Sequence, residues 1–279
     1  MPGRSKLLPA CGYMGSKRRC APAIVDRLLS HDPPLIYDVG CGSGAITLEL
    51  LSRGYPAKQI MCIESGPWGA FWLAVTLGEL KLDVVNDYFT KIDQMPLHEV
   101  KYWVENVVAK QSPTPENFLV MQSASIGAVA TWHTDSGWVQ PRNPTYTARP
   151  VWVPPTGSRE KSPRGTVFTP LKIVERVQAI AKAGYGLRVI HGRVEECSFF
   201  EPGVIYIDPP YSSFNTSGYR DSMDVRGTIT RACGPVYVSE GSALEGTIEA
   251  WALAGRKGAA INGKDRSGRG EEWLNRFRA

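Results

Sequence analysis

The chain has 279 residues, of which 43% are hydrophobic and 21% are charged, so it can form a large globular core and lacks the composition of a disordered protein. Its net charge of +5 is compatible with a polyanionic partner without requiring one. Residues 1–10 lack a signal-peptide pattern and no later segment has the length of a membrane span, which predicts a cytoplasmic protein without membrane contact.

The first predicted element is a helix near the amino terminus. Ser16 is a favourable N-cap residue, and four apolar residues after it fall on one helical face: Ile24, Val25, Leu28 and Leu29. Lys17, Arg18 and Arg19 would then lie in the first turn, where positive charges oppose the helix dipole by roughly a few tenths of a kcal/mol each. We therefore expect either an anionic group beside this turn or a solvated basic surface.

A strand, a glycine-rich loop and a helix come next. The strand covers residues 35–37, the helix covers residues 45–51 and ends at Gly54, and the loop between them is Asp38-Val39-Gly40-Cys41-Gly42-Ser43-Gly44. A second strand at residues 59–63 ends at Glu64. Glycines let the backbone approach a ligand closely, and an acid at the tip of the next strand is placed to bind both hydroxyls of a ribose. The pattern predicts a nucleoside cofactor, and the loose fingerprint Gly40-x-Gly42-x-x-Ala45 leaves NAD as a rival.

Residues 86–165 do not alternate as strand and helix. After Phe118 this segment is rich in Gly, Pro, Ser and Thr, and it interleaves basic and aromatic residues: Trp132, His133, Trp138, Arg142, Tyr146, Arg149, Trp152, Arg159, Lys161 and Arg164. Such a mixture suits phosphate contact, groove recognition and stacking against displaced bases, so we interpret it as an inserted region that binds nucleic acid. A proline-rich lid with its own aromatic cluster is the alternative, and His133 is interpreted as structural.

The alternating pattern resumes at Thr169-Pro170, a good N-cap and first-turn pair. The helix that follows places four apolar residues on one face before Gly184: Leu171, Val174, Val177 and Ile180. Further strands are predicted at residues 187–191, 204–207, 235–238 and 259–262. The chain is therefore predicted to be an α/β protein with a Rossmann-like, mainly parallel sheet.

The most informative motif follows the strand at residues 204–207. Asp208-Pro209-Pro210-Tyr211 places a carboxylate, a rigid carbonyl and an aromatic ring where open α/β sheets bind ligands. Asp208 and the Pro209 carbonyl are both acceptors for the two hydrogens of an exocyclic amine, and Tyr211 can stack on the ring that bears it. An ordinary turn is the alternative for the isolated tetrapeptide. A hydride-transfer enzyme has no evident use for this motif, whereas a methyltransferase that uses S-adenosylmethionine combines it with the glycine loop in one site.

These residues together resemble the amino-methylating nucleic-acid methyltransferases that carry an Asp-Pro-Pro-Tyr signature. The order of the motifs, with Tyr13-Met14-Gly15-Ser16-Lys17 first, the glycine loop next and Asp208–Tyr211 after a long insertion, is similar to the DNA adenine methyltransferases of the Dam type, including phage-encoded members. The resemblance covers about residues 10–85 and 166–279, and Glu271-Glu272-Trp273-Leu274-Asn275 also resembles a late strand motif of that family.

The resemblance implies a class I methyltransferase fold with catalytic parts at residues 1–85 and 166–279 and a target-recognition region at residues 86–165. It implies catalytic roles for Asp208, Pro209, Pro210 and Tyr211. The cofactor-binding residues that it implies are Tyr13, Lys17, Asp38, Gly40, Gly42, Glu64 and Asp208, with Tyr13–Lys17 at the methionine end and Glu64 on the ribose. Residues expected to contact nucleic acid are Arg142, Arg149 and Tyr219.

Two positions depart from the family pattern. Asp38 stands where the family usually has an aromatic residue, as in more general S-adenosylmethionine enzymes. The strand at residues 187–191 should end with an acid that touches the adenine of the cofactor, but Gly192-Arg193-Val194 follows, and Glu195 and Glu196 come slightly later. No residue is therefore assigned to the adenine contact.

We predict a site-specific methyltransferase that moves a methyl group from S-adenosylmethionine to the N6 amino group of an adenine flipped out of double-stranded DNA. Transfer to cytosine N4 is the nearest alternative, and a catalytically silent nucleic-acid-binding module of the same fold is an alternative of another class. A monomer is compatible with the sequence. The six cysteines lack metal-site spacing and the density of a disulfide scaffold, which predicts free thiols and no structural metal.

Overall fold

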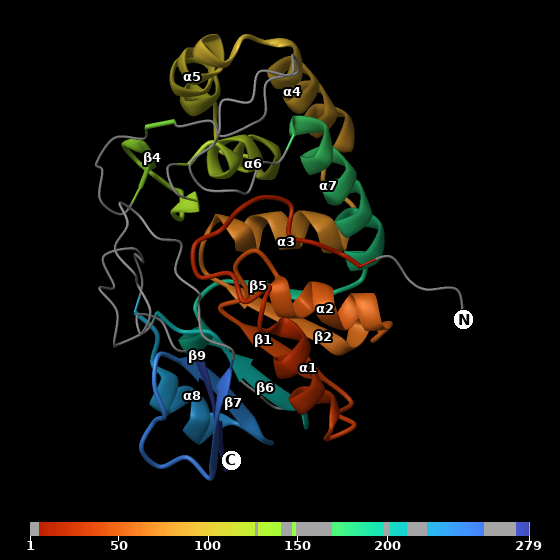
Figure 1. Cartoon of the computed structure of the whole chain (residues 1–279), viewed down its shortest axis with the longest axis vertical. Helices are drawn as coiled ribbons and strands as arrows, with labels where there is room; N and C mark the ends of the chain where they lie inside the picture. The colour runs from red at the N-terminus through yellow and green to blue at the C-terminus, as the bar shows by residue number, and fades with distance from the viewer. Residues whose placement is uncertain are drawn as a thin grey trace, which may run out of the picture.

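A seven-stranded, mainly parallel β-sheet lies at the centre of the protein (Figure 1). This computed structural model describes residues 6–125, 128–140, 147–148, 169–197, 201–210, 222–253 and 272–278. In sheet order the strands are β5 (Arg188–His191), β2 (Ile60–Glu64), β1 (Ile36–Val39), β6 (Val204–Ile207), β7 (Val236–Glu240), β9 (Glu272–Phe277) and β8 (Glu249–Leu253). Strand β9 is antiparallel to both of its neighbours, and the other neighbouring strands are parallel. The predicted α/β class and Rossmann-like sheet are confirmed.

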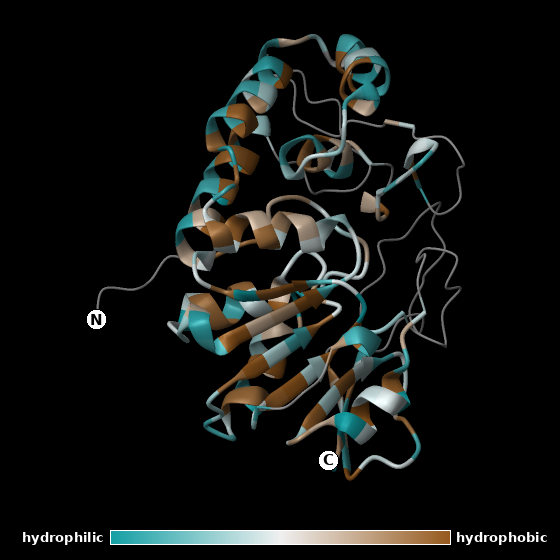
Figure 2. Ribbon diagram, turned by 180° about the vertical axis from the view of Figure 1, so that it is seen from behind, coloured by the Kyte–Doolittle hydropathy of each residue, from teal (hydrophilic) through white to brown (hydrophobic). Residues whose placement is uncertain are grey.

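Alternate residues of the central strands face two separate hydrophobic clusters. In β1, Ile36 faces one cluster, whereas Tyr37 and Val39 face the other. In β6, Tyr206 and Ile207 divide in the same way. Both faces of these strands are buried, which is why nearly all of their residues are apolar, as expected of a buried parallel sheet (Figure 2).

One face of the sheet packs against helices that share the larger cluster: α1 (Ala21–Leu29), α2 (Ala45–Arg53), α3 (Pro67–Leu77) and α7 (Pro170–Gly184). The other face packs against the short helices η4 (Val194–Glu196) and α8 (Val225–Arg231). A short η1 helix (Ala57–Gln59) precedes β2. Among the helices in the described ranges, none is long and apolar enough to cross a membrane.

A helical layer continues from the core at the end of the molecule that is uppermost in Figure 1. It contains α4 (Leu82–Gln94), α5 (Leu97–Asn106), η2 (Val108–Lys110) and α6 (Pro115–Ser123). Helix α4 packs against α6 and α7, and α6 packs against α3. A small antiparallel hairpin of β3 (Trp132–Thr134) and β4 (Gly137–Val139) follows. The expected start of the insertion at residue 86 thus falls inside α4, whose buried residues belong to the same hydrophobic cluster as the helices that pack on the central sheet.

Several predicted elements occur where the sequence placed them. Helix α2 begins at Ala45 and ends at Gly54, which adopts the left-handed conformation with φ of 87°. Helix α7 begins after Thr169, whose side chain accepts a hydrogen bond from the Lys172 N–H. Leu171 was expected on the buried face of α7 but is 45% exposed, because the core-facing residues are Ile173, Val174, Val177 and Ile180.

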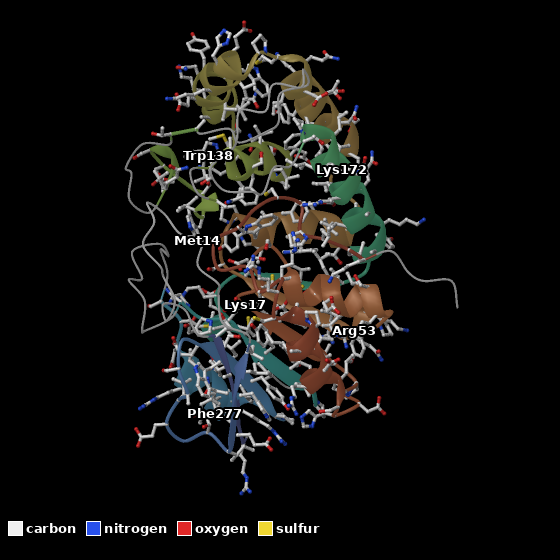
Figure 3. The ribbon with its side chains drawn as sticks, viewed as in Figure 1. Met14, Lys17, Arg53, Trp138, Lys172 and Phe277 are labelled. Atoms are coloured by element: carbon white, nitrogen blue, oxygen red, sulfur yellow. The ribbon has the colours of Figure 1, made fainter. Side chains whose placement is uncertain are left out.

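The predicted start of the first helix is wrong. Helix α1 begins at Ala21 rather than after Ser16, its N-cap is Cys20, and Pro22 lies in its first turn. Lys17 therefore precedes the helix and lies near the middle of the molecule, where Figure 3 labels it. Strand β8 was not predicted, and the strand expected at residues 259–262 lies outside the described residues.

Candidate active site

The carboxyl ends of β1, β2, β5 and β6 meet at one edge of the sheet. Strand β1 has β2 on one side and β6 on the other, so the direction of strand order changes there. Open α/β sheets bind ligands at such a switch point. The Asp208 N–H donates to the Val39 carbonyl at 2.9 Å, and the Gly40 N–H donates to the Ile63 carbonyl at 2.9 Å. These bonds hold the first residues beyond β1 and β6 beside each other.

The glycine loop is fixed from both sides. The Gly42 N–H donates to Glu64 Oε2 at 2.8 Å, and the Gly42 carbonyl accepts the indole N–H of Trp72 at 2.9 Å. Glu64 Oε1 also accepts the Gly66 N–H at 3.0 Å. The carboxylate at the tip of β2 therefore orients the glycine loop and the start of α3 at the same time.

Gly40 meets the end of β6 so closely that only glycine fits. Its φ is +71°, and a Cβ at this position would lie 2.6 Å from the Asp208 carbonyl oxygen. We expect Gly40→Ala to destabilise the protein by more than the roughly 1–2 kcal/mol that a left-handed alanine costs, because the clash is with backbone. Gly186→Ala is the matched control, since Gly186 has φ of +80° with nothing within 4 Å of its Cβ position. Equal losses of unfolding free energy in denaturant titrations would contradict the proposed close approach.

A buried charge cluster connects the amino-terminal segment to β6 and β9. The Lys17 ammonium lies 2.7 Å from Asp208 Oδ1 and 3.7 Å from Glu272 Oε1, and the Lys17 side chain is only 7% exposed. Lys17 Nζ also donates to the Gly15 carbonyl at 2.9 Å. The nearest carboxylate to this lysine is therefore that of Asp208, which begins the Asp-Pro-Pro-Tyr motif.

Burial raises the pKa values of two carboxyl groups in this region. The pKa of Asp208 rises to about 7, because burial outweighs the opposing effect of Lys17, and Glu272 and Asp38 raise it further. The pKa of Asp38 rises to about 6, again through burial, against hydrogen bonds from Thr47. Asp38 Oδ2 accepts the N–H and the hydroxyl of Thr47 at 3.1 and 2.7 Å, so Asp38 holds the start of α2 in place.

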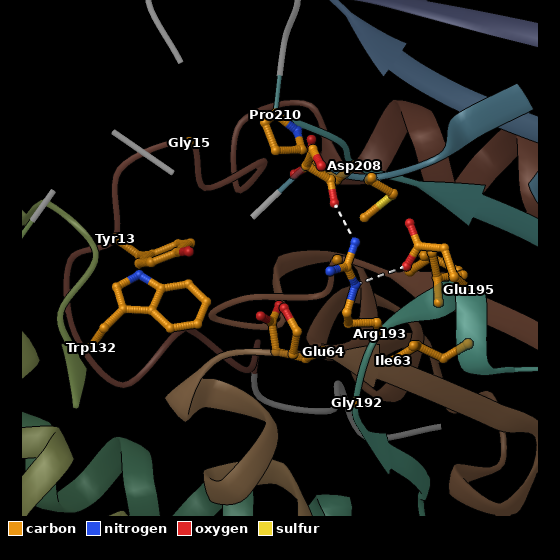
Figure 4. Close-up of a pocket in the computed structure, with 16 residues that line it drawn as sticks. Tyr13, Gly15, Ile63, Glu64, Trp132, Gly192, Arg193, Glu195, Asp208 and Pro210 are labelled. Atoms are coloured by element: carbon orange, nitrogen blue, oxygen red, sulfur yellow. Dashed lines mark hydrogen bonds and ion pairs between the residues drawn. The ribbon is translucent and has the colours of Figure 1, made fainter. Parts of the chain in front are cut away.

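Two adjoining pockets surround these groups. The larger has an empty volume of about 720 Å³, measured out to the solvent. Figure 4 shows Glu64 between Tyr13 and Trp132 on one side and Gly192, Arg193 and Glu195 on the other, with Asp208 and Pro210 facing the same space. The smaller pocket, of about 270 Å³, is lined by residues that include Tyr13, Lys17, Asp38, Gly40, Gly42 and Asp208.

The structure thus brings most of the predicted site residues together. The larger pocket is lined by Tyr13, Gly40, Glu64, Asp208 and Pro210, and Lys17, Asp38 and Gly42 line its smaller neighbour. Pro209 is buried and lines neither pocket. Four predicted residues lie outside the described residues: Tyr211, Arg142, Arg149 and Tyr219.

Several pocket residues had no assigned role from the sequence. Glu195 and Arg193 line the pocket, and Arg193 Nε lies 3.4 Å from Glu195 Oε2. Glu195 Oε1 also accepts the Asp224 N–H at 2.8 Å. Glu195, three residues after Gly192, therefore places a carboxylate in the pocket near the end of β5. Its distance from the strand in the sequence did not indicate this. Glu272 was noticed only as part of a short strand motif, although it lies beside Lys17.

Comparisons with known proteins do not assign the chain to a family. No protein-family model matches it, and no curated protein matches it. The functional conclusion therefore depends on the geometry of the site.

Proposed function

We propose that the protein is a DNA methyltransferase that transfers a methyl group from S-adenosylmethionine to the N6 amino group of a flipped adenine. One observation carries the proposal: the carboxylates of Asp208 and Glu64 line the same pocket, on either side of a glycine turn at the switch point of the sheet. The mainly parallel sheet with its antiparallel strand β9 is compatible with a class I methyltransferase.

The pocket has the chemistry that a nucleoside cofactor requires. Glu64 supplies a carboxylate acceptor for ribose hydroxyls. Ile63 and Val194 belong to one hydrophobic cluster against which Met223 packs, and all three line the pocket, which supplies an apolar surface for a flat base. When bound, S-adenosylmethionine would supply an electrophilic methyl group on sulfur.

Asp208 supplies the polarising group for the acceptor amine. An ionised carboxylate has about four lone-pair positions, so it can accept from Lys17 and from an amine together. Accepting the amine hydrogens makes the nitrogen lone pair more nucleophilic. If S-adenosylmethionine supplies the methyl group and its sulfur keeps the electron pair of the broken bond, the surplus proton of the alkylated nitrogen would leave through Asp208 to solvent. A pKa near the working pH suits this role.

The pH dependence of catalysis should follow the ionisation of Asp208. Because only the deprotonated carboxylate of Asp208 can act as a charged acceptor and take up the surplus proton, and because its pKa is raised to about 7, kcat/KM should rise with pH and level off above about pH 7. Lys17 lowers this pKa, so Lys17→Gln should move the rise to higher pH. Initial rates measured between pH 5.5 and 9 with each protein test this expectation. A profile that is flat down to pH 5 would remove Asp208 from the ionisation that controls the rate.

Cofactor binding separates the proposal from its NAD-binding rival. Titration calorimetry should detect binding of S-adenosylmethionine and S-adenosylhomocysteine, with no comparable affinity for NAD. Binding of NAD alone would overturn the proposal. Binding of S-adenosylmethionine without turnover on any nucleic acid would favour the silent binding module.

The inserted region is proposed to choose the DNA site. Its hairpin reaches the larger pocket through Trp132, and helices α4–α6 lie at the same end of the molecule as strand β4 of the hairpin (Figure 1). Arginine and aromatic residues interleave along the remainder of the segment, which suits contact with phosphates and displaced bases. Cytosine N4 stays the second candidate acceptor, since its amino group presents the same two hydrogens to Asp208.

A further inference from the structure

The inserted region supplies one wall of the larger pocket. Trp132, the first residue of β3, lines this pocket together with Tyr13 and Glu64 from the catalytic part. Its ring packs against the start of α3, where a Cβ on Gly66 would lie 2.8 Å from Trp132 Cη2. Figure 4 places Trp132 beside Tyr13, on the opposite side of Glu64 from Arg193. The hairpin therefore forms part of the pocket wall.

The indole nitrogen of Trp132 is a donor in need of an acceptor. Nε1 is buried and has no hydrogen-bond partner within the part of the chain that the structure describes. An indole nitrogen only donates, and a buried one usually finds an acceptor. In Figure 4 this nitrogen lies on the edge of the ring that is nearer Tyr13. An acceptor atom of a ligand at the Tyr13 side of the pocket would satisfy it, provided that the neighbouring side chains shift on binding to expose the nitrogen.

The pocket lining indicates which part of the ligand lies there, given the proposed function. If the ribose lies on Glu64, the apolar surface of Ile63, Val194 and Met223 takes the base on one side. The reacting methyl group must face Asp208. The amino-acid end is then left with the opposite side, which Tyr13, Gly15 and Trp132 line. Its carboxylate is the strongest acceptor in the cofactor.

We propose that Trp132 donates its indole N–H to the carboxylate of the amino-acid end of S-adenosylmethionine. This inference depends on the proposed function and adds a cofactor contact from the inserted region. The target-recognition region then completes the cofactor pocket and is not a separable module.

Two ligands and one substitution test this contact. S-Adenosylhomocysteine carries the amino-acid carboxylate, whereas 5′-methylthioadenosine shares its nucleoside and thioether but lacks the amino acid. Trp132→Phe removes the N–H and keeps an aromatic ring. Titration calorimetry should show a loss of S-adenosylhomocysteine affinity about 10-fold or more greater than the loss for 5′-methylthioadenosine, because a hydrogen bond to a charged group is lost only with the first. The ratio of the two losses removes the shared effect of a smaller ring.

Trp138→Phe is the matched control. Trp138 lies on β4 of the same hairpin, its Nε1 is likewise buried without a partner among the described residues, and its ring stacks on Phe118 with centroids 6.2 Å apart. It does not belong to the lining of either pocket. Its substitution should change the affinity for neither ligand. Trp132→His restores a ring N–H, so it should recover part of the affinity for S-adenosylhomocysteine that Trp132→Phe loses. It also tests the contact if Trp132→Phe is poorly folded.

The outcomes separate the contact from the function. If the wild-type protein binds both ligands and Trp132→Phe weakens them equally or not at all, the Trp132 contact is wrong and the cofactor assignment survives. If the wild-type protein binds neither ligand, the proposed function fails and the contact fails with it.

Discussion

Replacing Asp208 with asparagine is expected to lower the rate of methyl transfer about 100- to 1,000-fold, the usual effect of removing one preorganised group that polarises a reacting atom. The asparagine keeps the shape of the side chain, but it has only one acceptor oxygen. Its amide NH₂ is a donor and cannot accept a hydrogen from the substrate amine. The carboxylate lies 2.7 Å from Lys17 and lines the pocket, so the substitution changes the acceptor that the mechanism requires.

Binding and folding of Asp208→Asn must be measured together with its rate, so that a loss of chemistry is distinguished from a loss of structure. Lys17 is buried and loses the nearer of its two carboxylate partners in Asp208→Asn, so thermal unfolding should be compared with the wild type. Affinity for S-adenosylhomocysteine should change little if the protein stays folded. Asp32→Asn, at an exposed position between α1 and β1, is the control and should be fully active. Near-normal turnover by Asp208→Asn would exclude Asp208 from the chemistry.

Replacing Glu64 with alanine is expected to weaken S-adenosylmethionine binding by one to two orders of magnitude. A ribose hydroxyl that loses a charged acceptor costs about 1.5 to 3 kcal/mol. The structure adds a second reason, because Glu64 also accepts the N–H groups of Gly42 and Gly66 and so shapes the loop that approaches the ligand. Removing the Glu64 carboxylate should therefore make the glycine loop more mobile in addition to removing the contact with the ribose.

Glu64→Gln separates these two effects. Glutamine keeps one carbonyl acceptor for a backbone N–H but lacks the charge, so its affinity should lie between those of the wild type and Glu64→Ala. DNA affinity should be preserved in both variants, and Glu79→Gln, at an exposed position after α3, should behave as the wild type. Unchanged cofactor affinity in calorimetry for Glu64→Ala would place the ribose elsewhere in the pocket.

Local patterns in the sequence were sufficient for the centre of the fold. The glycine loop is set by residues close in the chain: Gly40, Gly42 and Gly44 all adopt positive φ, and Gly54 ends α2. Apolar runs bounded by turn residues likewise located β1, β2, β5, β6 and β7. Because parallel strands end at one edge, the positions of Glu64 and Asp208 at the carboxyl ends of their strands were enough to predict that both face one site.

Contacts between distant segments could not be predicted in this way. The Ser16 N-cap was a reasonable expectation from propensity, but α1 begins at Ala21 and Lys17 precedes it. Lys17 instead pairs with Asp208, which is far from it in the chain, so no local pattern indicates the contact. Trp132 was interpreted only as part of a nucleic-acid-binding segment, since nothing local indicates that its hairpin reaches the pocket. Strand β8 is a partly exposed edge strand, and its residues lack a clear apolar alternation.

The most direct test of the proposed function is to identify the methylated product. The protein is incubated with plasmid DNA and S-adenosylmethionine that carries a labelled methyl group, the DNA is digested to nucleosides, and the labelled nucleoside is identified by mass spectrometry. We predict labelled N6-methyladenine with the wild type and a loss of about 100-fold or more with Asp208→Asn. Labelled N4-methylcytosine would show that the methyl acceptor is cytosine N4, the second candidate, and not adenine N6. Absence of any labelled nucleoside from DNA, with cofactor binding demonstrated in the same preparation, would contradict the proposed function.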